Sequence, residues 1–207
     1  MNSSYSEMSS NCEQDPEEVN SKFRLSAIIL AGGPGKKMGA TGQLIPTVFL
    51  PIGLDPVINT SVQKCHECDD INYIWVLTRK KCDDLQGGKL ETWVNNWITL
   101  IKETELGKTK NLTTIFEEDL DSKAFSSEHG SVVAIYRFIS TGFIKDLLAE
   151  EAIDNFPTHI LIVAGDNYIT SDFSPLINAA KCYPEACLLY TSPSPRDRTR
   201  SRMPSSA

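Results

Sequence analysis

Four short apolar runs are spaced along the chain, and each is followed, at once or after one alanine, by a glycine or a charged residue. Runs of this length that lack strict polar alternation are typical of strands buried on both faces of a sheet. They predict strands over residues 25–30, 72–78, 112–116 and 159–163.

The segments between and after these runs space apolar side chains as amphipathic helices do. Strands that alternate with helices predict βαβ units, and therefore an α/β fold with a doubly wound, mostly parallel, Rossmann-like sheet. The predicted helices are residues 90–102, with Trp93, Trp97, Leu100 and Ile101 on one face; residues 131–143, with Val132, Ile135, Phe138 and Ile139 on one face; and residues 174–181.

Two of the predicted strands are followed by turns that could carry chemistry. The first strand leads into GGPGKK at residues 32–37, and the fourth leads into Gly165, Asp166 and Asn167. In a parallel sheet the carboxyl ends of the strands lie at one edge, where such folds bind ligands. We therefore expect both turns at the same edge of the sheet.

The glycine-rich turn has the composition of a phosphate-binding loop. Glycines let backbone N–H groups approach a phosphate without interference from Cβ, and Lys36 and Lys37 could offset its charge. The spacing matches neither a Walker loop, which needs Gly-Lys-Ser/Thr, nor the G-x-G-x-x-G of a Rossmann fingerprint. A tight strand-to-helix turn with solvent-facing lysines remains the alternative.

Composition and charge narrow the class of protein. The 207 residues carry a net charge of −7, whereas proteins that bind a nucleic-acid backbone usually present a basic face. No apolar run approaches the roughly 20 residues that cross a bilayer, and no secretory signal is visible. We therefore expect a cytoplasmic protein with neither nucleic-acid nor membrane partners.

The six cysteines fit reduced thiols in such a compartment. Only Cys65 and Cys68 have C-x-x-C spacing, and the other cysteines form no second pair of this kind. Structural zinc sites usually need two such pairs. The pattern favours ordinary thiols on a helix over a metal or redox site.

Three stretches of the sequence resemble one family. Residues 27–38 (AIILAGGPGKKM) resemble the L-A-G-G-x-G-x-R-M/L signature of nucleoside-diphosphate-sugar pyrophosphorylases, the sugar-1-phosphate nucleotidyltransferases. Residues 49–52 and 55–58 resemble the L-L-P-I…K-P-x-I stretch that follows it. Residues 161–167 and 172–176 are similar to the later V-x-x-G-D-N…D-F/L-x-x-L/I element. The likeness runs from about residue 26 to residue 177.

The resemblance implies transfer of a nucleotidyl group from an NTP to a sugar 1-phosphate, giving an NDP-sugar and pyrophosphate. Such chemistry depends on positioning and charge neutralisation, and Mg²⁺ is the implied cofactor. An enzyme that transfers CMP to phosphocholine shares a similar opening motif and stays open as a relative. The resemblance also leaves open a homo-oligomer or a subunit of a complex.

Residue by residue, the resemblance assigns Lys37 the place of the phosphate-binding arginine, and Asp166 that of the Mg²⁺ ligand. Gly130 falls near the position of a glycine that contacts the base. The nucleotide-binding set implied by the resemblance is Leu30, Ala31, Gly32, Gly33, Gly35 and Gly130.

Two positions depart from the family pattern. Lys37 keeps the charge of the arginine but loses its bidentate fork. Thr47 and Val48 stand where the family has Lys-Pro, and threonine supplies no charge to the reacting phosphates. The alternative is therefore a non-catalytic regulatory or scaffolding subunit, of the kind found in pyrophosphorylase and translation-factor exchange complexes.

The two ends of the chain differ from its middle. Residues 1–22 are poor in aliphatic side chains, which predicts a disordered acidic leader. Residues 187–197 resemble a one-frame translation of a transposase-end sequencing adapter, and residues 201–207 resemble the flow-cell primer in the same frame. We therefore expect residues 187–207 to be a non-native tail, and residues 23–186 to be a partial, truncated nucleotidyltransferase domain that is inactive by itself.

Overall fold

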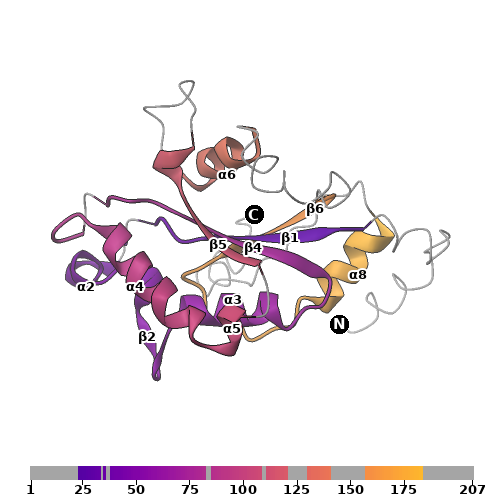
Figure 1. Cartoon of the computed structure of the whole chain (residues 1–207), viewed down its shortest axis with the longest axis horizontal. Helices are drawn as coiled ribbons and strands as arrows, with labels where there is room; N and C mark the ends of the chain where they lie inside the picture. Colours follow the sequence, from indigo (N-terminus) through magenta and orange to yellow (C-terminus); the bar gives the residue numbers. More distant parts are fainter. Residues whose placement is uncertain are drawn as a thin grey trace, which may run out of the picture.

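A four-stranded parallel sheet forms the centre of the fold (Figure 1). The computed structural model describes residues 23–33, 35, 38–82, 85–108, 111–120, 130–140 and 157–183. The strand order is β5-β4-β1-β6, and every neighbouring pair is parallel. The predicted mostly parallel α/β sheet is thereby confirmed. The strands are β1 (Leu25–Leu30), β4 (Ile71–Thr78), β5 (Asn111–Phe116) and β6 (His159–Ala164).

Strand β1 is buried on both faces of the sheet and supplies side chains to each in turn. Ala27, Ile28 and Ile29 are all fully buried. Because alternate side chains of a strand point to opposite faces, Ala27 and Ile29 join a larger core, whereas Ile28 joins a smaller one with Trp75 and Phe138. Burial on both sides accounts for the uninterrupted apolar sequence of this strand.

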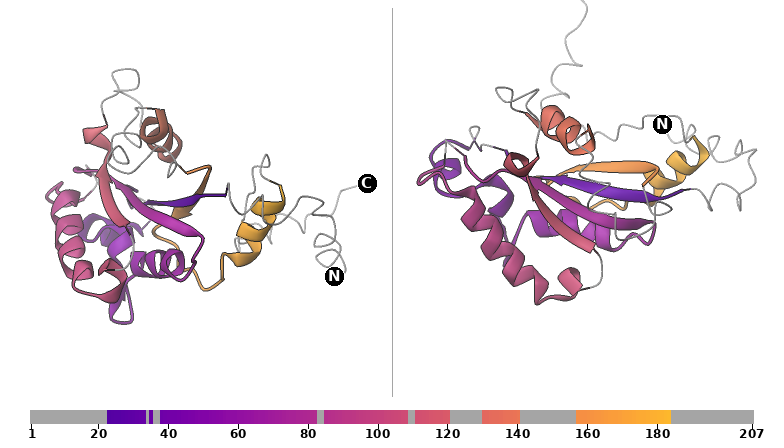
Figure 2. Two further views of the ribbon diagram at one scale, coloured as in Figure 1. Left: turned by 45° about the vertical axis from the view of Figure 1, so that its right-hand side comes forward. Right: turned by 45° about the horizontal axis from the view of Figure 1, so that its top comes forward.

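Helices cover the two faces, which makes the sheet doubly wound (Figure 2). The face with the larger core carries α3 (Ile58–His66), α4 (Leu90–Lys102) and α5 (Glu105–Lys108). The opposite face carries the 3-10 turn η4 (Glu117–Asp119) and α6 (Ser131–Ser140). The last described helix, α8 (Ser174–Cys182), packs Ile177 into the larger core.

The connection from β1 to α3 contains short elements that the apolar pattern does not predict. They are too short to produce a periodic signal, because each spans only two to five residues. They are the helix α2 (Ala40–Leu44), the 3-10 turn η3 (Thr47–Phe49), and a hairpin of β2 (Pro51–Ile52) and β3 (Asp55–Pro56).

Helix α4 has the predicted bounds, but its buried face differs from the prediction. Leu90, Val94, Trp97 and Ile101 are buried. Trp93 and Leu100 were assigned to the inner face, yet they are 39% and 67% exposed. The stripe that meets the sheet repeats every three or four residues from Leu90, and Trp93 and Leu100 both lie on one side of it.

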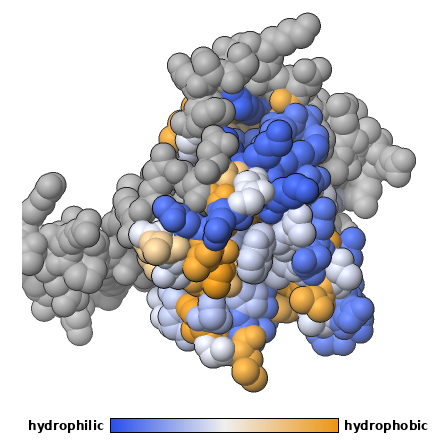
Figure 3. Space-filling view, turned by 90° about the vertical axis from the view of Figure 1, so that its left-hand side faces the viewer, coloured by the Kyte–Doolittle hydropathy of each residue, from blue (hydrophilic) through white to orange (hydrophobic). Residues whose placement is uncertain are grey.

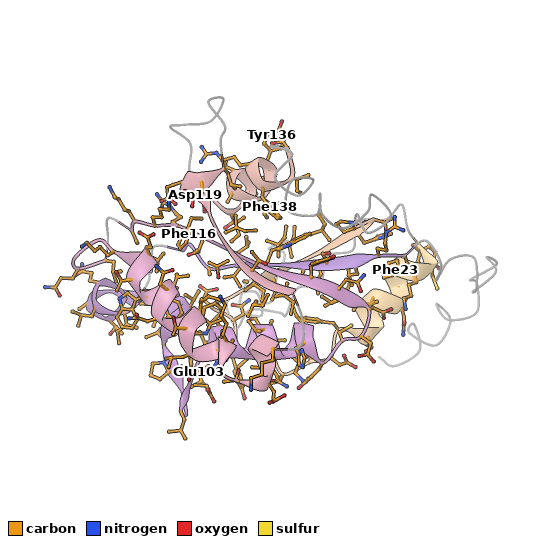
Figure 4. All side chains as sticks on the ribbon, viewed as in Figure 1. Phe23, Glu103, Phe116, Asp119, Tyr136 and Phe138 are labelled. Atoms are coloured by element: carbon orange, nitrogen blue, oxygen red, sulfur yellow. The ribbon has the colours of Figure 1, made fainter. Side chains whose placement is uncertain are left out.

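Helix α6 shows the same kind of correction. Phe138 is fully buried and meets the indole of Trp75 edge-on, with the ring centroids 5.2 Å apart. Val132 and Ile139, which the spacing assigned to the inner face, are 80% and 48% exposed. Figure 4 shows Phe138 on the sheet side of this helix and Tyr136 on its outer side. Residues 141–143 of the predicted helix lie outside the described residues.

The remaining boundaries agree with the prediction to within a residue or two. The structure begins β4 at Ile71, extends β6 to Ala164 and extends α8 to Cys182. Cys65 and Cys68 are both buried in the larger core; Cys65 belongs to α3, and Cys68 lies two residues beyond its end. Within the described ranges, no helix has the length and apolar character needed to cross a membrane.

Several predictions concern residues outside this description. The leader at residues 1–22, the tail at residues 187–207, and Pro34, Lys36 and Lys37 of the glycine loop all belong to that group.

Candidate functional site

The turns after β1 and β6 lie next to each other, as the sequence predicts. The two strands are parallel neighbours in unbroken register, from Leu25 opposite His159 to Leu30 opposite Ala164. Gly32 and Asp166 therefore leave the sheet at the same edge, two residues beyond a paired position. Figure 3 views the molecule from the side at which the strands end, and hydrophilic residues gather over its upper part.

Backbone hydrogen bonds fix where the β6 turn begins. The N–H of Gly165 donates to the carbonyl of Leu30 at 2.9 Å, which continues the sheet one residue past Ala164. The N–H of Asn167 then donates to the carbonyl of Ala164 at 3.3 Å and closes a tight turn. Asp166 occupies the middle of this turn, and its side chain is exposed.

Hydroxyl groups at the start of α3 hold this turn from below. Ser61, which is fully buried, donates to the carbonyl of Ala164 at 3.4 Å, and Thr60 donates to the carbonyl of Asn167 at 3.4 Å. Ala164 and Asn167, the first and last residues of the turn that contains Asp166, are therefore tied to a helix of the larger core. This support presents the Asp166 carboxylate from a fixed backbone.

The residues after β1 divide into a fixed part and an open part. The N–H of Ala31 donates to the carbonyl of Leu77 at 2.8 Å, and the buried hydroxyl of Thr78 donates to the carbonyl of Ala31 at 3.2 Å. Ala31 is thus held to β4 through both of its backbone groups. Among the described residues, the N–H groups of Gly32 and Gly33 make no backbone hydrogen bond and stay free to meet a ligand.

Gly35 marks the point where the loop packs against α2. Its φ of +60° lies in the left-handed region, and an added Cβ would lie 3.3 Å from the carbonyl oxygen of Gly42 and 3.3 Å from the methyl group of Thr47. The loop is therefore pressed against α2 and η3. Of the predicted cations of this loop, Lys36 and Lys37 are outside the described residues.

Thr47 contacts the glycine loop from the position where the resembling family carries lysine. Its side chain is 9% exposed, and its methyl group faces Gly35. At this position the loop meets a neutral, nearly buried side chain in place of a cation.

Two charged side chains at the same edge were missed by the sequence interpretation. Arg79 directly follows β4, and Glu117 directly follows β5. Both cover Gly32: an added Cβ there would lie 3.1 Å from Cγ of Arg79 and 3.2 Å from Oε1 of Glu117. The sequence could have identified both residues as part of this edge, because each is the first residue after a predicted strand.

In this pair, burial is the main influence on the pKa of Glu117. Burial raises the pKa of the Glu117 carboxyl, because the charged form loses water, and the nearby Arg79 guanidinium opposes that shift. Farther along the edge, the Glu118 carboxylate accepts the N–H of Lys80 at 2.9 Å. The ammonium group of Lys80 donates a hydrogen bond to Asp119, and this bond raises the pKa of Lys80. The turns after β4 and β5 are thus joined by opposite charges.

Gly130 lies at the start of α6, in the layer that covers the smaller core. Its φ is +145°, and its carbonyl accepts the N–H of Ala134 at 3.0 Å. An added Cβ on Gly130 would have no neighbour within 4 Å. The helix it starts packs beside η4, through contacts of Phe138 and Ala134 in the same core as Leu120.

A metal ion at this edge would be coordinated by a bound substrate as well as by the described protein residues. In the described part of the chain, no three His, Cys, Asp or Glu side chains converge on a point where an ion could bind. Asp166 offers one exposed carboxylate. Mg²⁺ is commonly held by one or two carboxylates together with substrate phosphates and water, so a lone carboxylate fits a metal that arrives with a nucleotide.

Comparisons with known proteins found matches among solved structures only. No protein-family model matches the chain, and no curated protein matches it in sequence. Three solved structures have a similar fold. One is described as a glucose-1-phosphate thymidylyltransferase from Bacillus anthracis in complex with a sucrose, with a TM-score of 0.46 and 22% identity over 74% of this chain and 49% of that one.

The second is a CTP:phosphocholine cytidylyltransferase from Streptococcus pneumoniae, with a TM-score of 0.42 and 19% identity over 72% of this chain and 48% of that one. The third is a UDP-glucose pyrophosphorylase complexed with UDP-glucose, with a TM-score of 0.46 and 16% identity over 79% of this chain and 54% of that one. This chain spans about half the length of these solved chains.

Proposed function

We propose that this chain carries the nucleotide-binding part of an enzyme that transfers a nucleotidyl group from an NTP to a sugar 1-phosphate. One observation carries the proposal: the glycine turn after β1 and the Asp166 turn after β6 leave neighbouring parallel strands at the same edge. The two motifs that resemble the pyrophosphorylase signature therefore meet in space, although more than 130 residues separate them in the sequence.

In the proposed reaction, an oxygen of the sugar 1-phosphate attacks the α-phosphorus of the NTP. The bond from the α-phosphorus to the bridging oxygen breaks, and pyrophosphate leaves with that oxygen. No covalent intermediate with the protein is needed, so the protein acts by positioning the phosphates and stabilising their charge. Gly32 and Gly33 would bind the nucleotide through their free N–H groups, which the anchored Ala31 holds in place.

Asp166 would hold Mg²⁺ together with the phosphates of the nucleotide. The ion supplies positive charge that offsets the negative charge developing on the transferred group. The contribution of the chain is to fix the carboxylate, which it does through the hydrogen bonds of the flanking residues to α3 and β1. Lys37 is proposed as the catalytic cation on the resemblance of its motif alone.

A second candidate function is favoured by Thr47. In the resembling family this position carries a lysine that contacts the reacting phosphates, and here it carries a neutral side chain packed on Gly35. Removing one preorganised electrostatic donor typically costs about 10²–10³ in rate. A regulatory or scaffolding subunit that keeps the nucleotide loop without fast turnover would tolerate this replacement.

Binding measured on this chain and turnover measured on the full-length natural protein separate these functions. Calorimetric titration of each of the four NTPs, with MgCl₂ and then with EDTA, tests the loop and Asp166. Pyrophosphate release with a set of sugar 1-phosphates tests the transfer. Mg²⁺-dependent NTP binding with release supports the enzyme, whereas binding without release supports the regulatory subunit. Failure to bind any NTP would contradict both.

A further inference from the structure

The edge of the sheet is chemically different on the two sides of the glycine turn. Because the strand order is β5-β4-β1-β6, Asp166 lies on one side of Gly32, and Arg79 and Glu117 lie on the other. The proposed function places the phosphates and their metal beside Asp166. The nucleoside must then extend across Gly32 towards the ends of β4 and β5.

Within the described part of the chain, the Glu117 carboxylate has hydrogen-bonding capacity that no other group uses. It is half-buried, and no described residue donates a hydrogen bond to it or forms an ion pair with it. A carboxylate that has lost water without gaining a donor is costly, and such groups call for a specific explanation. A ligand that brings N–H donors would supply one.

The position of Glu117 favours a base over a phosphate as that ligand. Its Oε1 would be only 3.2 Å from a Cβ on Gly32, so its negative charge lies directly over the glycine turn. On the side of Gly32 that faces Glu117, phosphates would be repelled, and they have no N–H groups to donate; the phosphates are therefore expected on the side of the glycine turn that faces Asp166. Arg79 covers the same glycine with its aliphatic stem, which brings a strong donor alongside the acceptor.

We propose that Glu117 and Arg79 together recognise guanine, so that the nucleotide substrate of this site is a guanine nucleotide. Guanine alone among the four common bases carries two adjacent donors, N1–H and the N2 amino group, which match the two oxygens of one carboxylate. Its O6 and N7 are acceptors for a guanidinium. Adenine, cytosine and uracil each offer the carboxylate a donor from one ring position only.

This inference rests on the proposed function, because it assumes that a nucleotide lies across Gly32. Its test is chosen so that the two can fail separately. The whole chain is titrated in MgCl₂ with GTP, ITP, ATP, CTP and UTP. ITP lacks only the N2 amino group, so the comparison of GTP with ITP examines the second donor without changing the protein. GTP should bind about tenfold or more tightly than ITP and than the other three nucleotides.

A variant of Glu117 then tests whether this residue causes the preference for GTP over ITP. Glu117→Gln replaces one acceptor oxygen with a donor, and it should reduce the preference for GTP over ITP to about twofold or less. Glu103→Gln is the matched control, because Glu103 is exposed just after α4 in the layer on the other face of the sheet (Figure 4). It should keep the wild-type preference.

Four results would overturn the proposal. Equal binding of GTP and ITP by the wild-type chain would show that the N2 amino group is not recognised. A loss of affinity for 2′-deoxy-GTP, without any loss for ITP, would assign Glu117 to the ribose. Tight binding of all NTPs without preference would remove the guanine inference and leave the proposed function standing, whereas no binding of any nucleotide would remove both.

Discussion

A methyl group on Gly165 would lie 2.9 Å from the carbonyl oxygen of Leu30 and 3.1 Å from Cγ2 of Ile29. Real Cβ atoms almost never approach a backbone oxygen this closely. The contact joins the ends of β6 and β1, and it brings the Asp166 turn against the glycine turn only because residue 165 has no side chain.

Gly165→Ala should therefore destabilise the fold. The clash is with backbone in a buried position, so the strands must separate, and overpacking of this kind costs about 1–3 kcal/mol of the free energy of unfolding. Urea denaturation measures the loss. Gly33→Ala is the control for stability, because an added Cβ there has no neighbour within 4 Å. Equal stability of the two variants would show that the contact is not tight.

Asp166→Asn should weaken Mg²⁺-dependent nucleotide binding and leave stability unchanged. The side chain is exposed, so it contributes little to packing. A neutral amide binds Mg²⁺ far less well than a carboxylate, and the loss of affinity should reach at least about tenfold. Calorimetry with and without EDTA measures it. Asp69→Asn, an exposed acid before β4 at the opposite edge of the sheet, is the matched control. An Asp166→Asn variant with wild-type affinity would exclude this residue as the ligand.

Glu117→Gln should stabilise the fold relative to the wild type, and the difference should grow as the pH rises. The pKa of Glu117 is raised above its ordinary value of 4.5. A group whose pKa is raised by folding stabilises the fold fully below its unfolded pKa, and that stabilisation disappears as the pH passes through the folded-state pKa. Glutamine does not ionise, so the variant keeps its stability over this range. Urea denaturation of both proteins from about pH 4 to pH 8 tests the trend.

Asp172 serves as a control because its pKa is shifted in the opposite direction. The backbone N–H and the hydroxyl of Ser174 both donate to it, which lowers its pKa below the ordinary value of 3.8. Its stabilisation is present above that value and is lost as the pH falls through the lowered pKa. A difference between wild type and Glu117→Gln that stays constant with pH would contradict the raised pKa.

Phe138→Ala should be among the most destabilising single changes in the smaller core. The ring is fully buried and packs edge-on against Trp75, and truncating a buried phenylalanine costs about 3–5 kcal/mol. Ile139→Ala changes the next residue of the same helix, which is 48% exposed, and it should cost well under half as much. The reverse order in urea denaturation would mean that the helix is rotated from the position described.

Thr47→Lys, made in the full-length natural protein, should increase pyrophosphate release if the site is an enzyme that lacks one cation. An ammonium beside Gly35 would add charge where the phosphates are expected, with a gain of up to about 10²–10³ in kcat. Thr41→Lys makes the same change at an exposed position of α2 and should have little effect. Unfolding curves must show that the variant is folded, because Thr47 is nearly buried. A folded variant without any gain in release or affinity would favour the regulatory subunit.

The sequence alone sufficed for the strands and for the edge that they share. β1 is predicted to the residue, because a strand buried on both faces must be apolar throughout, and that pattern depends only on local composition. The parallel direction of β1 and β6 also follows, since strands separated by helices can only be joined by crossovers, whereas the structure shows that the two strands are neighbours. The meeting of Gly32 with Asp166 is a consequence of that topology.

The helix faces required the tertiary structure. Apolar residues on α6 exceed the number that one face can hold, and the position of Trp75 decides that Phe138 turns inward and Ile139 outward. Periodicity cannot make that choice, because neighbouring positions on a helix satisfy the same spacing. The same reason explains why Trp93 and Leu100 lie beside the buried stripe of α4.

The residues of the candidate site also fall into two groups: those that the sequence identified and those that only the structure revealed. Gly32, Gly33 and Asp166 belong to local motifs, so the residues themselves identified them. Arg79, Glu117 and the contact of Thr47 with Gly35 come from separate segments with no motif of their own. Which side chain covers which glycine depends on the order of the strands in the sheet. The sequence determined where the strands lie and which turns carry the phosphate and metal chemistry, and only the packing of β4 and β5 beside β1 decided which charges surround them.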